Sequence, residues 1–198
     1  EPLAAGGVSG ARSSGSVAVL PIRGPISQYE GMFFGGVSTE RLSADIKRLG
    51  ADQTVSAIIL DIASPGGTVG GVPELAADIL AAREQKPVIA FCSLAASAAY
   101  WLASGASEIV VPASGEVGSI GVFAAHADIS EMLKAAGEKV TLISAGKKKV
   151  WGNPFEPLSE EARAEVQSHI DAIYGMFVQA VAKGRGVSPN DVRSGFGE

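Results

Sequence analysis

The chain has 198 residues, of which 46% are hydrophobic and 19% are charged, and its formal net charge at pH 7 is −5. This balance is typical of one folded domain with a substantial core, and it excludes an intrinsically disordered chain. The negative charge argues against nucleic acid as a main partner. No apolar run approaches the roughly 18 residues that a membrane-spanning helix needs, so we expect no membrane span in this chain.

Residues 1–15 are rich in Gly and Ser, and we expect them to form a flexible lead-in to a single domain over residues 16–198. Apolar periodicity then predicts strands and helices in alternation. The expected strands cover residues 17–22, 55–62, 88–92, 108–111, 119–125 and 140–144. The expected helices cover residues 39–49, 69–83, 95–103, 129–136 and 160–183, the first capped by Thr39 and the last by Ser159. This order predicts an α/β fold with a largely parallel sheet.

The first candidate motif is Ser64-Pro65-Gly66-Gly67, which follows the buried strand predicted over residues 55–62. Sites in parallel α/β proteins form at the carboxyl ends of strands, and adjacent glycines let the backbone turn an N–H toward a ligand. A plain tight turn explains the same residues, so this motif alone does not identify a site.

The second motif is Ser93-Leu-Ala-Ala-Ser97-Ala-Ala99, directly after the strand predicted over residues 88–92. A serine at a strand-to-helix junction exposes its Oγ, and the N–H of the next residue points the same way at the helix N-terminus. The small flanking residues leave room for a substrate backbone. A tightly packed helix of small residues is the alternative explanation.

The third motif is a run of lysines, Lys147, Lys148 and Lys149, in a loop bounded by Gly, Asn and Pro. A solvated basic turn is the usual explanation of such a run, and the spacing of a phosphate-binding loop is absent. The residues themselves do not choose among the three lysines if one of them is a base.

The three motifs together contain what acyl transfer requires, which is a nucleophile, a base and two donors for the oxyanion. Ser97 can supply the nucleophile, and the N–H groups of Gly67 and Ala98 can supply the donors. A lysine acts as a base only when it is neutral, which requires its pKa to fall from about 10.4 to roughly 7–8. Desolvation has this effect, and residues 144–154 contain no carboxylate that would oppose it.

In order and spacing, these motifs resemble the signal peptide peptidase A (SppA) family of serine peptidases, within the ClpP/crotonase superfold. The resemblance covers about residues 16–196. It is carried by Ser64-Pro-Gly-Gly67, Ala95-Ala-Ser97 with Tyr100-Trp101, Gly118-Ser-Ile-Gly-Val122, and Gly146-Lys-Lys-Lys149 with Gly152-Asn-Pro-Phe155. Within the family, Gly152-Asn-Pro and the helix around residues 167–177 look most like the phage and prophage head-maturation (prohead) proteases.

The resemblance implies a ClpP/crotonase-like fold of repeated β-β-α units and a role for each matching residue. Ser97 aligns with the nucleophile, Lys149 with the base, and Ser119 with a serine that orients the lysine amine. Gly67 and Ala98 align with the oxyanion-hole residues. The family's usual last helix and strand would follow the end of this chain.

The glycine content predicts where substrate binds. We expect an extended peptide to add a strand beside Gly66, Gly70, Gly118 and Ile120. The resemblance further implies a homo-oligomer, a ring or a stacked tetramer or octamer, in which Ser and Lys come from different protomers. We expect no cofactor, and no metal site, because neither histidine has ligand spacing to a cysteine or to the other histidine.

We therefore predict a serine endopeptidase with a Ser-Lys dyad, which cleaves peptide bonds through an acyl-enzyme. Its context would be phage capsid (prohead) maturation in the cytoplasm of an infected or lysogenic bacterium. A cellular SppA-type enzyme that degrades signal peptides, associated with the membrane, is the alternative within the family.

Three further alternatives remain open. A ClpP-like Ser-His-Asp triad could use His126 and Asp61, whereas His169 lies inside the longest predicted helix, where a surface or packing role fits better. A crotonase-type acyl-CoA enzyme would share the oxyanion hole without needing Ser97. A non-catalytic, ring-forming scaffold component would need neither the oxyanion hole nor Ser97.

Overall fold

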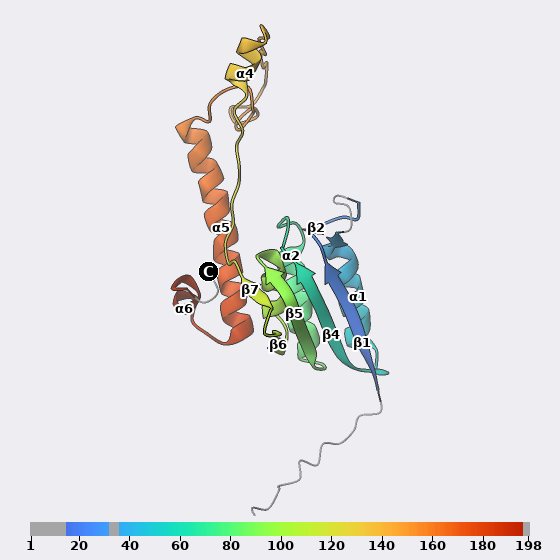
Figure 1. Ribbon diagram of the computed structural model, residues 1–198. Coiled ribbons are helices and arrows are strands. Elements are labelled where there is room, and N and C mark those ends of the chain that lie inside the picture. Colours follow the sequence, from blue (N-terminus) through green and yellow to red (C-terminus); the bar gives the residue numbers. More distant parts are fainter. Residues whose placement is uncertain (1–14, 32–35, 196–198) are drawn as a thin grey trace, which may run out of the picture.

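The computed structural model describes residues 15–31 and 36–195 (Figure 1). The predicted lead-in over residues 1–15 lies outside the described residues except for Gly15. The centre of the fold is a five-stranded sheet in the order β1-β4-β5-β6, with β7 also paired to β5. Its strands are β1 (Ser16–Arg23), β4 (Val55–Ser64), β5 (Val88–Ala96), β6 (Glu108–Val110) and β7 (Glu116–Gly118). Every pair in it is parallel, so the predicted α/β class is confirmed.

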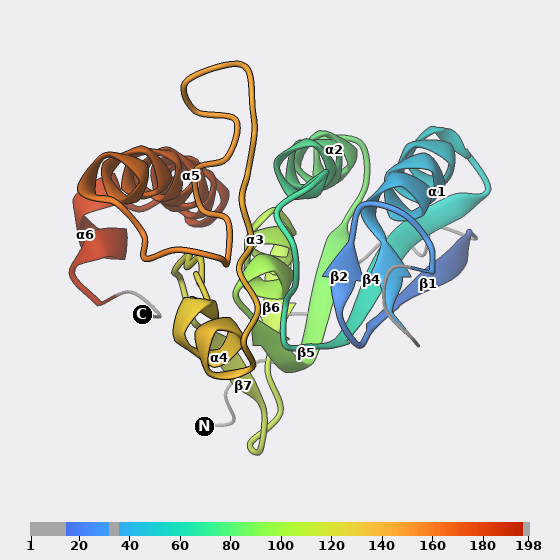
Figure 2. The ribbon, with the colours of Figure 1, turned by 90° about the horizontal axis from the view of Figure 1, so that it is seen from above.

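Helices cover one face of this sheet. They are α1 (Thr39–Ala51), α2 (Val72–Arg83) and α3 (Ala98–Ser104), and all three lie on the same side (Figure 2). The apolar side chains of α1 recur at helical spacing, which places Leu42, Ile46 and Leu49 in the core. Cys92 is buried in β5, and burial raises the pKa of its thiol to about 11.

A second, two-stranded sheet lies next to the site that the sequence indicates. It pairs β2 (Ile26–Ser27) with β3 (Val37–Ser38), and Ile26 also bridges to Gly67. Ser38 caps α1, because its Oγ accepts a hydrogen bond from the Arg41 N–H at 3.3 Å. The prediction of Thr39 as the cap was wrong by one residue. The Thr39 hydroxyl instead donates to the Gly70 carbonyl at 3.0 Å.

The longest helix, α5 (Glu160–Arg185), has 26 residues and begins at the predicted cap, Ser159. At 1.5 Å per residue it is about 39 Å long. Apart from Ala162, its buried residues lie in its C-terminal third. Its N-terminal half extends away from the sheet together with residues 119–159, which include α4 (Ser130–Ala135) (Figure 1). We call residues 119–159 the arm, and the rest of the domain the body.

The C-terminal third of α5 is fixed to the body by aromatic stacking. The rings of Trp101 in α3 and Phe177 in α5 lie 4.6 Å apart at an interplanar angle of 8°. Gly184 then approaches the end of α3 so closely that a Cβ there would lie 2.1 Å from the Ser104 carbonyl oxygen. The orientation of α5 on the body is therefore set by close packing.

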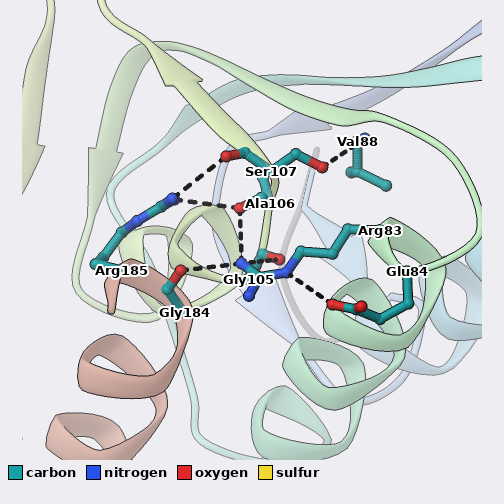
Figure 3. A network of polar contacts seen from close by, with 8 residues as sticks. All are labelled: Arg83, Glu84, Val88, Gly105, Ala106, Ser107, Gly184 and Arg185. Atoms are coloured by element: carbon teal, nitrogen blue, oxygen red, sulfur yellow. Dashed lines mark hydrogen bonds and ion pairs between the residues drawn. The ribbon is translucent and has the colours of Figure 1, made fainter. Parts of the chain in front are cut away.

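Two arginines add a polar clamp at the same place (Figure 3). Arg83 donates to the carbonyls of Gly184 at 2.9 Å and Ala106 at 3.1 Å. Arg185 donates to the carbonyls of Ala106 at 3.2 Å and Ser107 at 3.4 Å. Burial lowers the pKa of Arg185. These bonds satisfy the carbonyls of Ala106 and Ser107 just beyond the end of α3 and that of Gly184 in the last turn of α5, which have no helical partner there.

Two predicted strands, residues 119–125 and 140–144, are absent, and both predictions were wrong. Both segments lie in the arm, where the described residues include no neighbouring strand to which their backbone could hydrogen-bond. Their β-branched, apolar composition is typical of strands, but composition forms a strand only where a partner satisfies the backbone.

Other predicted helix boundaries differ from the observed ones by a few residues. The helix predicted over residues 95–103 begins at Ala98, because β5 continues through Ala96. The helix predicted from residue 69 begins at Val72, after Gly71 in a left-handed conformation. A short helix, α6 (Pro189–Arg193), was not predicted, although the capping box of Ser188 and Asp191 that begins it is visible in the sequence.

Two glycines of α5 make a matched stability test. Gly184→Ala forces a Cβ against the Ser104 carbonyl, and we expect it to lower the free energy of unfolding by about 1–3 kcal/mol. Gly175→Ala meets no heavy atom within 4 Å and should raise that free energy by about 0.5–1 kcal/mol. Urea denaturation measures both, and equal effects of the two substitutions would contradict the docking of α5.

Candidate active site

Ser97 lies at the junction between β5 and α3 in a strained conformation, with φ 53° and ψ −124°. Ser97 and Ser119 are the two residues other than glycine with positive φ in the described part of the chain. Such conformations cost about 1–3 kcal/mol and cluster at functional sites. The Ser97 N–H donates to the Gly118 carbonyl at 2.9 Å, which ties the end of β5 to the end of β7. A sharp strand-to-helix turn of this kind exposes a serine hydroxyl.

The glycine turn after β4 lies directly beside this junction. Gly66 has φ 94°, and a Cβ on it would lie 2.7 Å from the Ala96 carbonyl oxygen and 2.9 Å from the Ser97 Cβ. The buried Ser64 hydroxyl accepts a hydrogen bond from the Gly66 N–H at 3.1 Å, which fixes the turn. The structure therefore brings the first two sequence motifs into contact.

Two N–H groups beside Ser97 are available as donors. Ile26 bonds to the residues on either side of Gly67, since its N–H donates to the Gly66 carbonyl and its carbonyl accepts from the Thr68 N–H, both at 2.9 Å. This pairing leaves the Gly67 N–H unused, and it has no acceptor within residues 15–31 and 36–195. Ala98 is in the first turn of α3, where an N–H has no helical acceptor.

A pocket of about 300 Å³ opens next to these groups. Ser97, Gly67 and Ala98 all border it. Most of the remaining lining is apolar. It comes from the turn before α2, from α2, α3 and α5, and from the first residues of the arm: Val69, Val72, Trp101, Phe177, Gly121, Val122 and Phe123. Such a lining suits an apolar side chain of the substrate. Of these lining residues, Trp101, Gly121 and Val122 belong to motifs that carried the resemblance. The sequence did not indicate that Phe177 would reach the pocket.

The residues predicted to bind substrate lie around this pocket and not in its wall. Gly66 and Gly118 are buried, and Ile120 is 4% exposed. A Cβ on Gly70 would meet the Gln28 side chain at 3.0 Å. Of the four, Gly66 and Gly118 contact the Ser97 junction directly. The contact of all four with substrate stays a prediction.

Ser119 and Lys149 have different places. Ser119 is exposed and directly follows Gly118, whose carbonyl accepts from Ser97, so it lies at the base of the arm beside the junction. Lys149 is exposed. The loop of residues 144–154 that contains it lies near α4, at the far end of the arm from the sheet (Figure 1). One chain therefore brings together Ser97, Gly67, Ala98 and Ser119, and it does not bring Lys149 to them.

The structure also distinguishes the lysines from one another. Lys148 Nζ lies 2.7 Å from Glu165 Oε2 on α5 and 5.2 Å from the centre of the Trp151 ring. The hydrogen bond from Lys148 lowers the pKa of Glu165. This ion pair occupies the Lys148 amine, which makes Lys148 unsuited to act as a base. Lys147 and Lys149 have no polar partner for their amines among the described residues.

The residues of a His-Asp triad are not assembled in one chain. His126 Nε2 donates to the Asn153 carbonyl at 2.8 Å, within the arm. Asp61 forms an ion pair with Arg23 of the neighbouring strand β1. His169 is exposed on α5. In the described part of the chain, none of the three has a hydrogen bond or ion pair with Ser97.

The model of peptidase family S49 matches residues 81–195 of the chain, a span that contains Ser97 and Lys149. The chain belongs to peptidase family S49. This confirms the resemblance, because signal peptide peptidases and phage capsid proteases are among the relatives. Within residues 15–31 and 36–195, this family member has no helix that is both long and apolar enough to cross a bilayer.

The relatives of this S49 chain include phage proteins. It is 40% identical over 180 residues to the head-tail preconnector protein GP5 of Enterobacteria phage P21, and covers 36% of that protein with 89% of its own length. It is 36% identical over 176 residues to the capsid assembly protease C of Escherichia phage lambda, covering 40% of that protein with 87% of its own length. It is 30% identical over 190 residues to protease 4 of Salmonella typhi, covering 29% of that enzyme with 92% of its own length.

Thus the S49 chain spans less than half the length of each of these relatives. A solved structure, that of the 1510-N membrane-bound stomatin-specific protease, superposes with a TM-score of 0.52 at 16% identity. The superposition covers 92% of this chain and 70% of that one, which supports the shared fold.

The contact of Gly66 with the Ser97 junction can be tested by stability. Gly66→Ala puts a Cβ against the junction at a positive φ, and we expect the free energy of unfolding to fall by about 1–3 kcal/mol. Pro65→Ala, at the exposed neighbouring position, should change it by less than about 0.5 kcal/mol. If Gly66→Ala is as mild as Pro65→Ala in urea denaturation, the two motifs are not in contact.

Proposed function

We propose that the protein is a serine endopeptidase of phage capsid (prohead) maturation, with Ser97 as nucleophile and Lys149 of a second copy as general base. The observation that carries the proposal is the strained Ser97 at the mouth of an apolar pocket, with the unused N–H groups of Gly67 and Ala98 beside it. This arrangement supplies every group that acyl transfer needs except the base.

Catalysis would proceed in two steps. The neutral Lys149 amine takes the proton of the Ser97 hydroxyl as Oγ attacks the scissile carbonyl, and Gly67 and Ala98 donate to the resulting oxyanion. The ammonium returns the proton to the leaving amine, which leaves an acyl-enzyme. Water then gives a proton to the Lys149 amine as it attacks the ester and forms a tetrahedral intermediate. This intermediate releases the carboxylic acid product as the ammonium returns that proton to Ser97 Oγ. Ser119 would orient the amine through its own hydroxyl.

The exposed side chains of the arm support an assembly of several copies. Phe123 is 89% exposed, Met132 62% and Ile143 96%, so the arm presents large apolar groups that its own body does not cover. Large apolar side chains with this degree of exposure suit a protein interface. A second copy that covers the arm would also remove Lys149 from water, which favours the neutral amine. A ring or a stacked tetramer or octamer would repeat this contact.

The phage context rests on the relatives. The two phage proteins match 89% and 87% of this chain, and one of them is called a capsid assembly protease. The substrate would then be a capsid-associated protein with an apolar residue that enters the pocket beside Ser97. Such an enzyme would act in the cytoplasm of the infected bacterium.

The three lysines provide an internal comparison. Lys149→Ala should lower kcat for an apolar fluorogenic peptide by about 10²–10⁴-fold, because the general base is lost. Lys147→Ala should be close to wild type, and Lys148→Ala should lose less than about tenfold, since Lys148 only ties the loop to Glu165. A Lys149→Ala variant with wild-type kcat would exclude Lys149 as the base.

Sharing of the site between copies can be tested by complementation. Ser97→Ala and Lys149→Ala chains should each be inactive alone, and their coexpression should restore cleavage, because one copy supplies the serine and the other the lysine. Coexpression of Ser97→Ala with a Ser97→Ala, Lys149→Ala double variant is the matched control and should stay inactive. A mixture that stays inactive although it assembles would indicate that both residues act within one chain.

A further inference from the structure

The arm consists of two legs on either side of α4. The outgoing leg, residues 119–129, leads from β7 to α4, and the returning leg, residues 136–159, leads from α4 to α5 and contains the lysine loop, residues 144–154. His126 lies on the outgoing leg, and its Nε2 is 2.8 Å from the carbonyl oxygen of Asn153 on the returning leg. A carbonyl oxygen only accepts, so Nε2 carries the proton and donates. Three residues further on, the Ile129 N–H donates to the Pro154 carbonyl at 2.8 Å. These bonds give the two legs a fixed register.

Asn153 then organises the loop from inside. Its side-chain Nδ2 donates to the Val150 carbonyl at 2.8 Å and to Glu156 Oε1 at 2.7 Å. Its Oδ1 accepts from the Phe155 N–H at 2.9 Å, and its own N–H donates to the Val150 carbonyl at 3.2 Å. One side chain therefore uses both ends of its amide to hold the chain on either side of it.

These contacts reach Lys149 through its neighbour. The Lys149 N–H donates to the Gly146 carbonyl at 3.1 Å, and the carbonyl of the next residue, Val150, is held twice by Asn153. The Lys149 side chain has no polar contact of its own in the part of the chain that the structure describes. The backbone on either side therefore sets where the Lys149 side chain leaves the loop and in which direction it starts.

We propose that His126 and Asn153 are positioning residues for the lysine base. His126 holds the Asn153 carbonyl through a hydrogen bond, and the Asn153 side chain holds the loop through its own hydrogen bonds. This loop presents Lys149 to the serine of another copy. This inference rests on the proposed role of Lys149. It assigns His126 a role as a hydrogen-bond donor, which a glutamine can also fill, and not as an acid or base of a triad.

A set of substitutions separates these roles. His126→Ala removes the hydrogen-bond donor, and Asn153→Ala removes the side chain that bonds to both sides of the loop. Both substitutions should lower kcat by about 10–100-fold. KM should stay within about twofold, because the pocket beside Ser97 is unchanged. His126→Gln keeps an N–H near the same place and should recover kcat to within about threefold of wild type. His169→Ala, at an exposed histidine on α5, is the matched control and should behave as wild type.

A second readout does not depend on activity. In a Ser97→Ala background, limited trypsin digestion at residues 147–149 should be faster in His126→Ala and Asn153→Ala than in the parent, because the loop is no longer held. His126→Gln should match the parent. Thermal unfolding and the size of the assembly are recorded for every variant, and only variants that match the parent in both are compared.

Each outcome decides a separate question. Equal loss of kcat in His126→Gln and His126→Ala would make His126 an acid or base and overturn the positioning role. Wild-type kcat and trypsin resistance in His126→Ala and Asn153→Ala would overturn it as well. A fully active Lys149→Ala would instead refute the proposed base, whatever the other variants show.

Discussion

The close approach of three backbone segments at the carboxyl end of the sheet is the constraint on which the site depends. The turn after β4, the start of α3 and the end of β7 meet there, with Gly66 against Ser97 and Gly118 bonded to it. A parallel sheet delivers all three strand ends to one edge. Only glycine fits at Gly66, and Ser97 keeps its strained conformation because both neighbours hold it. The place of Ser97 at the pocket and the unused N–H groups follow from this contact.

The second organising feature is the division between body and arm. The stack of Trp101 on Phe177 and the arginine clamp fix one end of α5, and the helix carries the arm away from the sheet. A helix of about 39 Å is a rigid spacer. It separates the lysine loop from the serine of the same chain while it presents that loop at a defined place outside the body. Under the proposed dyad, the serine and its base therefore lie in different parts of one chain.

Much of the body could be predicted from sequence, because its elements bury their apolar residues within the same chain. The strand over residues 55–62 and the helix from residue 160 show this, the first as a continuous apolar run and the second by its cap and periodicity. The arm could not be predicted in this way. Residues 119–125 and 140–144 have strand-like composition but no strand beside them, and their exposed side chains suit an interface with another chain.

The candidate site also contains residues whose place could be predicted from the sequence and residues whose place could not. Ser97 and Gly67 follow strands that are neighbours in the sheet, so their meeting could be anticipated from the order of elements. Phe177 reaches the pocket from a helix that is distant in sequence, and no local pattern indicates this. Lys149 was selected among the lysines by family resemblance alone. The ion pair of Lys148 with Glu165 is an independent physical reason not to assign the adjacent Lys148 as the base.

The most direct test of the account is a cross-link between two chains. Thr68→Cys lies beside Ser97 and Ala145→Cys lies in the lysine loop, and both positions are exposed. Cys92 is buried with a pKa raised to about 11, so it does not compete for a short bismaleimide. A tagged Thr68→Cys chain mixed with an untagged Ala145→Cys chain should give a covalent heterodimer, whereas a double variant should give no cross-link within one chain. An intrachain cross-link in the double variant, or an assembly that yields no heterodimer, would contradict the claim that two copies share the site.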